Sequence, residues 1–342
     1  MQREVHAVRT SAAFVEASSI VALRVRGPGA FEALDRVVAA DLYVRNGHLR
    51  HTLVLDPEGH PIADCYVCND DDEYVLLAHG MTAEALAELV RAPRVEVTDL
   101  SERYASIGLH GPFAWEVLSV VEGASVGGIP YLSFYRGREG TLVFRAGNTG
   151  EYGYEVLVPK ARRDAVVGRL LEVGKRFDLV HVTEAALSHC ALENCFFDAR
   201  LVERCNTLDL TPIELQLQWR ISSAKAYRGG DAVRARKSAL RQRVTAVRST
   251  HALRTGDEVR HGDRVIGAVL DAERSLTLGD SVGLALLDLP YAHSGIDRYT
   301  ANGAPLRTVS APFVNNLSSY VNPQRHSYAA RHEIAFPGAD RT

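Results

Sequence analysis

The feature that most constrains the fold is a short unit that occurs twice in the chain. Residues 20–38 and 104–121 carry Gly, Pro, Ala, Glu, Leu and Val in the same register, 84 positions apart (111 minus 27). Each copy predicts a strand, a Gly-Pro turn and an amphipathic helix. Because such a helix needs a sheet to cover its apolar face, the repeat indicates either an internal duplication or two related α+β subdomains.

A glycine-rich turn leads into an alternating strand further along the chain. The stretch Arg145–Pro159 begins Arg-Ala-Gly-Asn-Thr-Gly-Glu-Tyr-Gly, and its second half places a tyrosine and two valines on one face and Glu155 and Leu157 on the other. This alternation predicts a strand. A turn this tight exposes backbone N–H groups and polar side chains, and what these groups serve depends on the surroundings of the stretch.

Three strands are predicted between the two copies of the repeat, at 51–55, 60–68 and 73–78, with Asp56-Pro-Glu-Gly59 as the turn between the first two. Asp64 is a carboxylate inside an otherwise apolar strand. A buried charge is costly unless it has a partner, so we expect Asp64 either to be paired or to face a cavity.

The cysteines indicate reduced thiols. There are five, at positions 65, 68, 190, 195 and 205, and an odd number spread along the chain argues against a disulfide framework. Cys65 and Cys68 have the C-x-x-C spacing of zinc and redox sites, but an alternating strand would point them to opposite faces, and no second pair follows. Core thiols are the favoured interpretation, and a metal or redox site is the alternative.

The second half of the chain changes from helical patterns to short β segments. Helical patterns cover 160–177, 183–195 and 225–240, and Glu193 lies at the C-terminal end of the second. From about residue 243, short β segments alternate with glycine turns. This texture is typical of a small all-β unit of the sandwich or barrel type.

The composition is that of a folded soluble protein. Charged residues make up 24% and hydrophobic residues 46%, and the net charge of -3 provides no basic surface for a nucleic acid. The first ten residues lack the apolar centre of a signal peptide, and no uncharged apolar segment is long enough to cross a bilayer. We expect a cytoplasmic monomer or homodimer without nucleic-acid or membrane partners.

Four motifs, in order, resemble the glycine-cleavage T-protein and its folate-binding relatives, which include dimethylsulfoniopropionate demethylase and the aryl O-demethylases. Residues 145–155 resemble R-T-G-Y-T-G-E-x-G-F-E, and 191–193 resemble part of R-L-E-A. Residues 211–219 resemble T-P-x-E-x-x-L-x-W, and 225–233 resemble K-x-F-I-G-R-E-A-L. With the β unit that follows, the resemblance covers most of the chain.

The resemblance implies an α+β fold, a T-protein-like cloverleaf of two α+β subdomains with a small C-terminal β-barrel or sandwich, and a central channel for tetrahydrofolate. The folate-binding region would span 1–240 and the β domain 241–325, followed by a tail at 326–342. The chain after about Pro323 is expected to be poorly structured.

The resemblance also implies which residues hold the folate. A reduced pterin presents a ring N–H and an amino group as adjacent donors, which one carboxylate accepts together, and Glu193 is the matching position. Asp64 would be a second anchor, Lys225 a counter-charge for the folate tail, and Trp219 a stacking surface. The alternatives are a solvated helix-end glutamate, a solvated lysine and a core tryptophan.

Departures from the family pattern concern the chemistry. The resemblance implies an aspartate after the third strand that assists aminomethyl transfer. Here His79 stands where an asparagine is expected, Leu86 lies near the expected aspartate, and Glu84 could substitute only after a shift of register. In the folate-channel wall, Asn148 replaces a tyrosine. These differences favour another one-carbon donor.

We therefore predict a tetrahydrofolate-dependent methyltransferase or demethylase that moves a methyl group from a small O-, S- or N-methylated molecule to N5 of tetrahydrofolate. His79 would offer a proton or hydrogen bond to the leaving heteroatom, with Glu84 as a second catalytic candidate. A structural His79 that caps the helix at Thr82 is the alternative. Aminomethyl transfer of the glycine-cleavage type, and a folate-binding regulatory or iron–sulfur assembly protein without turnover, remain open.

Overall fold

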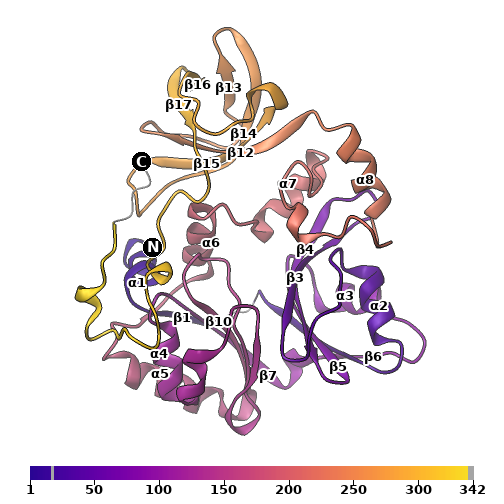
Figure 1. The fold of residues 1–342 in the computed structure, drawn as a ribbon, viewed down its shortest axis with the longest axis vertical. Coiled ribbons are helices and arrows are strands. Elements are labelled where there is room, and N and C mark those ends of the chain that lie inside the picture. Colours follow the sequence, from indigo (N-terminus) through magenta and orange to yellow (C-terminus); the bar gives the residue numbers. More distant parts are fainter. Residues whose placement is uncertain (17–18, 338–342) are drawn as a thin grey trace.

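The computed structural model describes residues 1–16 and 19–337, and these residues form two sheets, the helices that cover them and a barrel (Figure 1). The strands of the first sheet are β2 (Val21–Arg26), β3 (Leu49–Leu55), β4 (Pro61–Asp70), β5 (Glu73–His79) and β6 (Glu96–Asp99), in the order β3-β4-β5-β2-β6. The strands of the second sheet are β1 (Ala13–Glu16), β7 (Tyr104–His110), β8 (Phe134–Arg136), β9 (Leu142–Phe144), β10 (Gly153–Pro159) and β11 (Val180–His181), in the order β11-β1-β7-β10-β9-β8.

Helices cover the outer faces of both sheets. The α-helices of the described residues are α1 (Gln2–Thr10), α2 (Ala30–Val37), α3 (Ala83–Val90), α4 (Ala114–Glu122), α5 (Arg163–Gly174), α6 (Glu184–Glu193), α7 (Val202–Thr207) and α8 (Gly230–Ser238). Leu34 of α2 and Leu86 of α3 pack on the first sheet. Leu118 of α4 and Leu170 of α5 pack on the second. The inner faces of the two sheets pack on each other, which gives four layers in the order helix, sheet, sheet, helix.

Both copies of the sequence repeat form the predicted strand, turn and helix. β2 leads through Gly27 into α2, and β7 leads through Gly111 into α4. The two glycines have φ values of +112° and +119°. A Cβ atom at Gly27 would lie 2.3 Å from a backbone oxygen, and one at Gly111 would lie 2.7 Å from another, so only glycine fits either turn. Each copy therefore belongs to one α+β subdomain, and the predicted α+β fold of this region is confirmed.

The predicted alternation of β10 is also confirmed. Tyr154 and Val156 face the core under α4 and α5, whereas Leu157 faces the layer between the two sheets. On β4, Cys65 packs toward α2 and α3 and Cys68 packs toward the second sheet, so the two thiols point to opposite faces as expected. Both thiols are reduced and buried.

The C-terminal β unit is a closed barrel, which lies at the top of Figure 1. Its strands are β12 (Gln242–Ser249), β13 (Glu258–His261), β14 (Arg264–Arg274), β15 (Ser281–Asp288), β16 (Tyr299–Ala301) and β17 (Ala304–Thr308). Their order is β12-β15-β14-β13-β16-β17, and closure leaves no free sheet edge. The α+β architecture with a small β-barrel is therefore the one predicted.

The segment after the barrel returns to the second sheet. Tyr328 is buried, and its ring lies 5.3 Å from Phe113 and 5.8 Å from Phe177 between ring centres. Its backbone N–H donates a hydrogen bond to Glu116 Oε2 at 2.7 Å. The prediction of a poorly structured chain after Pro323 is wrong for residues 323–337. This polar segment is held by the contacts of Tyr328 with aromatic residues that are distant in the sequence. Residues 338–342 lie outside the described part.

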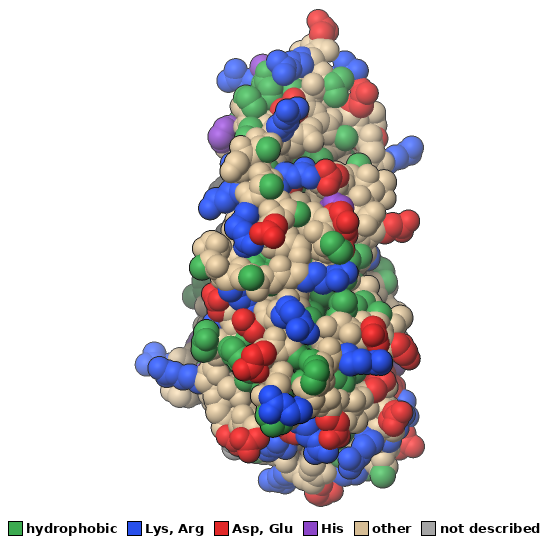
Figure 2. All heavy atoms as spheres, turned by 90° about the vertical axis from the view of Figure 1, so that its right-hand side faces the viewer, with side chains coloured by type: hydrophobic (Ala, Val, Ile, Leu, Met, Phe, Trp, Pro, Cys, Tyr) green, Lys and Arg blue, Asp and Glu red, His purple; other side chains and the backbone are tan. Residues whose placement is uncertain are grey.

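The surface shows no preference for one charge on the face that carries α2 and α8. Figure 2 shows basic and acidic side chains intermixed over this face. Mixed charges of this kind are typical of a solvated surface. Within residues 1–16 and 19–337, no helix combines the length and the apolar character needed to span a bilayer.

Candidate active site

Three adjoining cavities lie between the two sheets, α6 and the barrel. The first, second and third cavities have volumes of about 220, 350 and 300 Å³. Phe197 lines the first and second, Gly147 lines the first and third, and Phe196 lines the second and third. Because each pair shares a wall residue, the cavities lie side by side, and together they have the size of a small-molecule site.

The first cavity receives polar side chains from both sheets. Asp64 of β4 and His79 at the end of β5 are register partners in the first sheet. His110 at the end of β7 and Glu155 of β10 come from the second sheet, and Asn148 comes from the turn before β10. Three residues predicted from the sequence, Asp64, His79 and Asn148, thus line one cavity.

Asp64 is held by two partners from other parts of the chain. Its Oδ1 accepts hydrogen bonds from His51 Nε2 at 2.7 Å and from Arg220 Nη1 at 2.8 Å. Burial acts to raise the pKa of Asp64, but His51 and the Arg220 guanidinium outweigh burial and lower it. Asp64 is therefore an ionised carboxylate in the cavity wall. The expectation that it is paired or faces a cavity is confirmed in both respects.

Glu155 and His110 are buried neighbours with unsatisfied polar atoms. Glu155 Oε1 lies 4.0 Å from His110 Nε2. Within the part of the chain that the structure describes, Glu155 Oε2 and both ring nitrogens of His110 have no hydrogen-bond partner. Burial raises the pKa of Glu155 to about 8, with the charge of Glu184 adding to the shift, and burial lowers the pKa of His110 to about 4. At neutral pH an uncharged acid therefore lies beside an uncharged imidazole, an arrangement common at functional sites.

The sequence contained a signal for one of these two residues. Glu155 is a carboxylate in a strand that is buried on both faces, which is the same signal that identified Asp64. The predicted strand placed it opposite Tyr154 without assigning it a role. His110 precedes the second Gly-Pro turn, and nothing in the local pattern distinguishes it from an ordinary core histidine.

The glycine-rich turn that carries Asn148 is fixed from two sides. The carbonyl of Thr149 accepts a hydrogen bond from Arg9 Nη1 at 2.6 Å. Glu151 Oε2 accepts hydrogen bonds from the backbone N–H and the hydroxyl of Ser318, at 2.8 and 2.6 Å. The turn is therefore held between α1 and the segment that follows the barrel.

The two catalytic candidates from the sequence lie in different environments. Burial lowers the pKa of His79 although the charge of Asp64 opposes the shift, so this cavity imidazole is uncharged at neutral pH. It does not cap α3, because the Thr82 hydroxyl itself accepts a hydrogen bond from the Ala85 N–H at 3.2 Å. Glu84 is exposed on α3, and the structure does not bring it to the first cavity.

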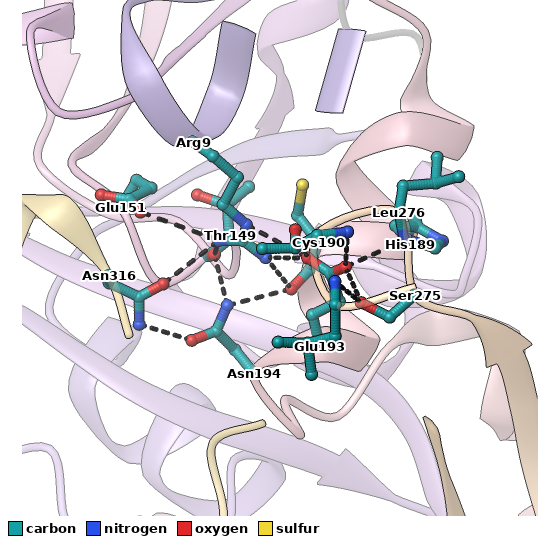
Figure 3. Close-up of polar contacts among 12 residues, drawn as sticks. Arg9, Thr149, Glu151, His189, Cys190, Glu193, Asn194, Ser275, Leu276 and Asn316 are labelled. Atoms are coloured by element: carbon teal, nitrogen blue, oxygen red, sulfur yellow. Dashed lines mark hydrogen bonds and ion pairs between the residues drawn. The ribbon is translucent and has the colours of Figure 1, made fainter. Parts of the chain in front are cut away.

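Glu193 is fully buried at the end of α6 and lines none of the three cavities. Figure 3 shows its carboxylate enclosed by side chains from distant segments. Its Oε2 accepts from Arg9 Nε at 3.1 Å and Nη2 at 2.8 Å, and its Oε1 accepts from Ser275 Oγ at 2.6 Å. Thr277 adds hydrogen bonds from its N–H and its hydroxyl, at 3.1 and 2.8 Å.

These contacts give Glu193 a role inside the protein. Burial acts to raise its pKa, but His189, Arg9 and Ser275 outweigh burial and lower it to about 2. The ionised carboxylate joins α1, α6 and the loop between β14 and β15. The solvated-glutamate interpretation is wrong, and the structure does not bring the predicted pterin ligand to the cavities.

The remaining predicted residues lie near the rim or away from it. Trp219 lines the second cavity with its side chain 62% exposed, so the core interpretation is wrong. Lys225 Nζ donates to the carbonyl and the carboxylate of Asp35, at 2.6 and 2.7 Å, and lines none of the three cavities. The positive charge of Lys225 is therefore paired with the Asp35 carboxylate inside the protein.

Comparisons with known proteins agree with this architecture. A family model described as GCVT N-terminal domain matches residues 1–225. An aminomethyltransferase of Saccharopolyspora erythraea is 30% identical over 91% of this chain and 89% of its own length. One of Alkaliphilus oremlandii is 28% identical over 85% of this chain and 82% of its own. The crystal structure of glycine cleavage system aminomethyltransferase T from Bartonella henselae superposes with a TM-score of 0.78, 20% identity and coverage of 92% of this chain and 90% of that chain, a likeness of fold.

Proposed function

The chain belongs to the glycine-cleavage T-protein family, and from this premise we propose that it transfers a one-carbon unit to tetrahydrofolate in an aminomethyltransferase type of reaction. The observation that carries the proposal beyond family membership is the buried pair of Glu155 and His110. Buried polar atoms without partners are rare in folded proteins, and those that line a cavity are suited to a ligand.

Glu155 fits the recognition chemistry of a reduced pterin. The ring N–H and amino group of a pterin are adjacent donors, which one ionised carboxylate accepts together. Glu193 cannot take this role without giving up its contacts with Arg9, whereas Glu155 Oε2 has no such partner in residues 1–16 and 19–337. We assign the pterin contact to Glu155, with His110 beside it as a second polar contact.

Asp64 and His79 are suited to act on the transferred group. Tetrahydrofolate supplies a nucleophilic N5 that accepts the one-carbon unit. An aminomethyl group gains positive charge as it leaves its donor, and the ionised Asp64 carboxylate in the cavity wall would stabilise that charge. The uncharged imidazole of His79 can accept a proton or donate a hydrogen bond at the same cavity.

Aminomethyl transfer calls for a carboxylate at the site. Leu86, which lies near the position of the expected aspartate, is buried in the core of the first subdomain and provides none. Carboxylates from β4 and β10 nevertheless line the first cavity. Methyl transfer from an O-, S- or N-methylated molecule is the second candidate, and it is favoured by Asn148, which lines the cavity where the family motif has a tyrosine.

Binding and product analysis test the proposal. Calorimetry should show that the protein binds tetrahydrofolate, that Glu155→Gln loses most of this affinity, and that Glu88→Gln, an exposed control on α3, retains it. After turnover, 5,10-methylenetetrahydrofolate indicates an aminomethyl donor and 5-methyltetrahydrofolate a methyl donor. A protein that does not bind tetrahydrofolate would refute both candidates.

A further inference from the structure

The wall of the second cavity contains a buried arginine with unused donors. Arg220 is 0% exposed, and its Nη1 donates to Asp64 Oδ1 at 2.8 Å. No acceptor for its Nε or Nη2 exists among the residues that the structure describes. Trp219 covers the guanidinium, with the Arg220 Cζ 4.6 Å from the ring centre. A buried charge with unmet donors is costly, and this cost indicates a ligand.

The unused nitrogens form the edge by which a guanidinium binds a carboxylate. Nε–H and one Nη2–H point the same way along one edge of the planar guanidinium and can donate two nearly parallel hydrogen bonds. The same protein uses this edge elsewhere: Arg9 donates through Nε and Nη2 to the Glu193 carboxylate, at 3.1 and 2.8 Å. Arg220 presents the same edge without the carboxylate.

The surroundings of Arg220 suit a small ligand with one negative charge. The second cavity, about 350 Å³, is lined mainly by apolar side chains such as Phe197 and Leu217, and Arg220 is the only charged group among its described lining residues. The amide Nε2 of Gln216 already donates to a backbone carbonyl at 2.6 Å. A single charged anchor in an apolar wall fixes the orientation of a ligand.

We propose that the free edge of Arg220 binds the carboxylate of the one-carbon donor, so that the donor is a small carboxylic acid carrying the transferable group on a nearby heteroatom. This inference rests on the proposed folate-dependent transfer in its methyl form. The inference also distinguishes two kinds of donor. A free small acid brings a carboxylate to Arg220, whereas a donor joined to a carrier protein through an amide bond brings none.

The position of Arg220 favours the donor over the tail of the folate as the source of the carboxylate. Arg220 is hydrogen-bonded to Asp64, which lines the first cavity together with Glu155. A carboxylate on the free edge would therefore lie one guanidinium away from Asp64. The tail carboxylates of a folate are separated from its pterin by a whole benzoyl group, so a pterin at Glu155 would carry them beyond this position.

Calorimetry on the wild-type protein saturated with tetrahydrofolate tests the inference. The probes are methoxyacetate, (methylthio)acetate and N-methylglycine, each paired with its neutral carboxamide. At least one carboxylate should bind, and its amide should bind about thirtyfold more weakly or worse, because the amide leaves the buried charge unpaired. If tetrahydrofolate binds and none of the carboxylates does, the inference is overturned while the proposed function stands. If tetrahydrofolate does not bind, both fail.

Substitutions of Arg220 distinguish the two sources of carboxylate. Arg220→Lys keeps a positive charge beside Asp64 but cannot present the two-nitrogen edge, and Arg220→Gln removes the charge. Both should bind the carboxylate probe at least about thirtyfold more weakly and keep wild-type affinity for tetrahydrofolate. Arg26→Gln, which alters an exposed arginine on β2, should change neither. Thermal unfolding establishes that each variant is folded.

Two results would contradict the assignment. Unchanged affinity for the carboxylate probe in a folded Arg220→Lys protein would show that the edge does not bind it. Weaker binding of tetrahydrofolate in that variant, with unchanged binding of 6-methyltetrahydropterin, which lacks the glutamate tail, would assign the edge to the folate's own carboxylate.

Discussion

Replacement of Glu155 by glutamine should stabilise the protein at high pH while it removes the proposed pterin contact. Burial raises the pKa of Glu155 to about 8 from an ordinary value of 4.5, and the charge of Glu184 adds to the shift. The folded chain therefore disfavours the ionised carboxylate, which the unfolded chain exposes to water. Glutamine has nearly the same shape and no charge, so it removes this unfavourable contribution.

The sign and the pH window follow from the two pKa values. Between 4.5 and about 8 the folded chain keeps a proton that the unfolded chain has released, so the free energy of unfolding falls as the pH rises through this interval. His110 has the opposite effect below 6.5, because burial lowers its pKa to about 4 and the unfolded chain binds the extra proton. The two effects offset each other between about 4.5 and 6.5.

Between pH 6.5 and about 8, only Glu155 of this pair changes the free energy of unfolding with pH. One and a half pH units at about 1.36 kcal/mol per unit correspond to a loss of about 2 kcal/mol in the wild-type protein that Glu155→Gln avoids. Other titrating groups contribute equally to both proteins, so the difference between them isolates Glu155.

Urea denaturation followed by circular dichroism measures this difference. The free energy of unfolding of Glu155→Gln, minus that of the wild type, should grow by about 2 kcal/mol between pH 6.5 and 8, and tetrahydrofolate binding should be lost. Glu88→Gln, on an exposed part of α3, should show no such growth. A difference that stays constant over this range would refute the argument, because it would mean that the buried carboxyl is already ionised at pH 6.5.

Three further predictions concern the site and its supports. Arg9→Leu leaves the carboxylate of Glu193 buried without the guanidinium that pairs with it, so the free energy of unfolding should fall by about 3–5 kcal/mol; a loss below 1 kcal/mol in a urea titration would contradict the network of Figure 3. Tetrahydrofolate binding at pH 7 should release up to one proton, because the pterin donors favour the ionised form of Glu155; calorimetric heats that do not vary with the ionisation enthalpy of the buffer would exclude this contact. Tyr328→Ala should lower stability by about 3 kcal/mol through lost packing on Phe113, and an unchanged melting temperature would show that the C-terminal segment does not contribute.

The fold could be predicted from the sequence because the patterns that specify its strands, turns and helices are local. Gly27 and Gly111 mark turns that only glycine can adopt, and the periods of the flanking residues distinguish strand from helix over short distances. The C-terminal segment was not accessible, because Tyr328 is held by rings that lie more than a hundred positions earlier in the chain. No local pattern carries that information.

The site could be predicted only in part, because many of the contacts that define it join residues far apart in the sequence. Asp64 could be recognised because a carboxylate in an apolar strand needs a partner or a cavity wherever the strand lies. Glu193 and Lys225 could not be assigned, because their partners Arg9 and Asp35 lie 184 and 190 positions away. A family motif places such residues in the fold. It does not show whether their charges and hydrogen bonds are already satisfied by other residues of the chain.

Two pairs of residues in this protein contrast a charged group that is satisfied within the chain with one that is not. Glu193 and Glu155 are both buried glutamates, but Glu193 accepts hydrogen bonds from Arg9, Ser275 and Thr277, whereas Glu155 Oε2 accepts none within residues 1–16 and 19–337. The pKa values follow this contrast, since that of Glu193 is lowered to about 2 and that of Glu155 is raised to about 8.

Arg9 and Arg220, which are both buried, differ in the same way. Arg9 donates through its Nε and Nη2 edge to Glu193, whereas the same edge of Arg220, a residue that lines the second cavity, has no acceptor among the described residues. A buried charge that is satisfied within the chain stabilises the fold, and one that is not satisfied costs stability unless a ligand completes it. The unsatisfied members of the two pairs are Glu155, which lines the first cavity together with Asp64, and Arg220, which donates a hydrogen bond to Asp64. Glu155 is assigned to the folate and Arg220 to its donor.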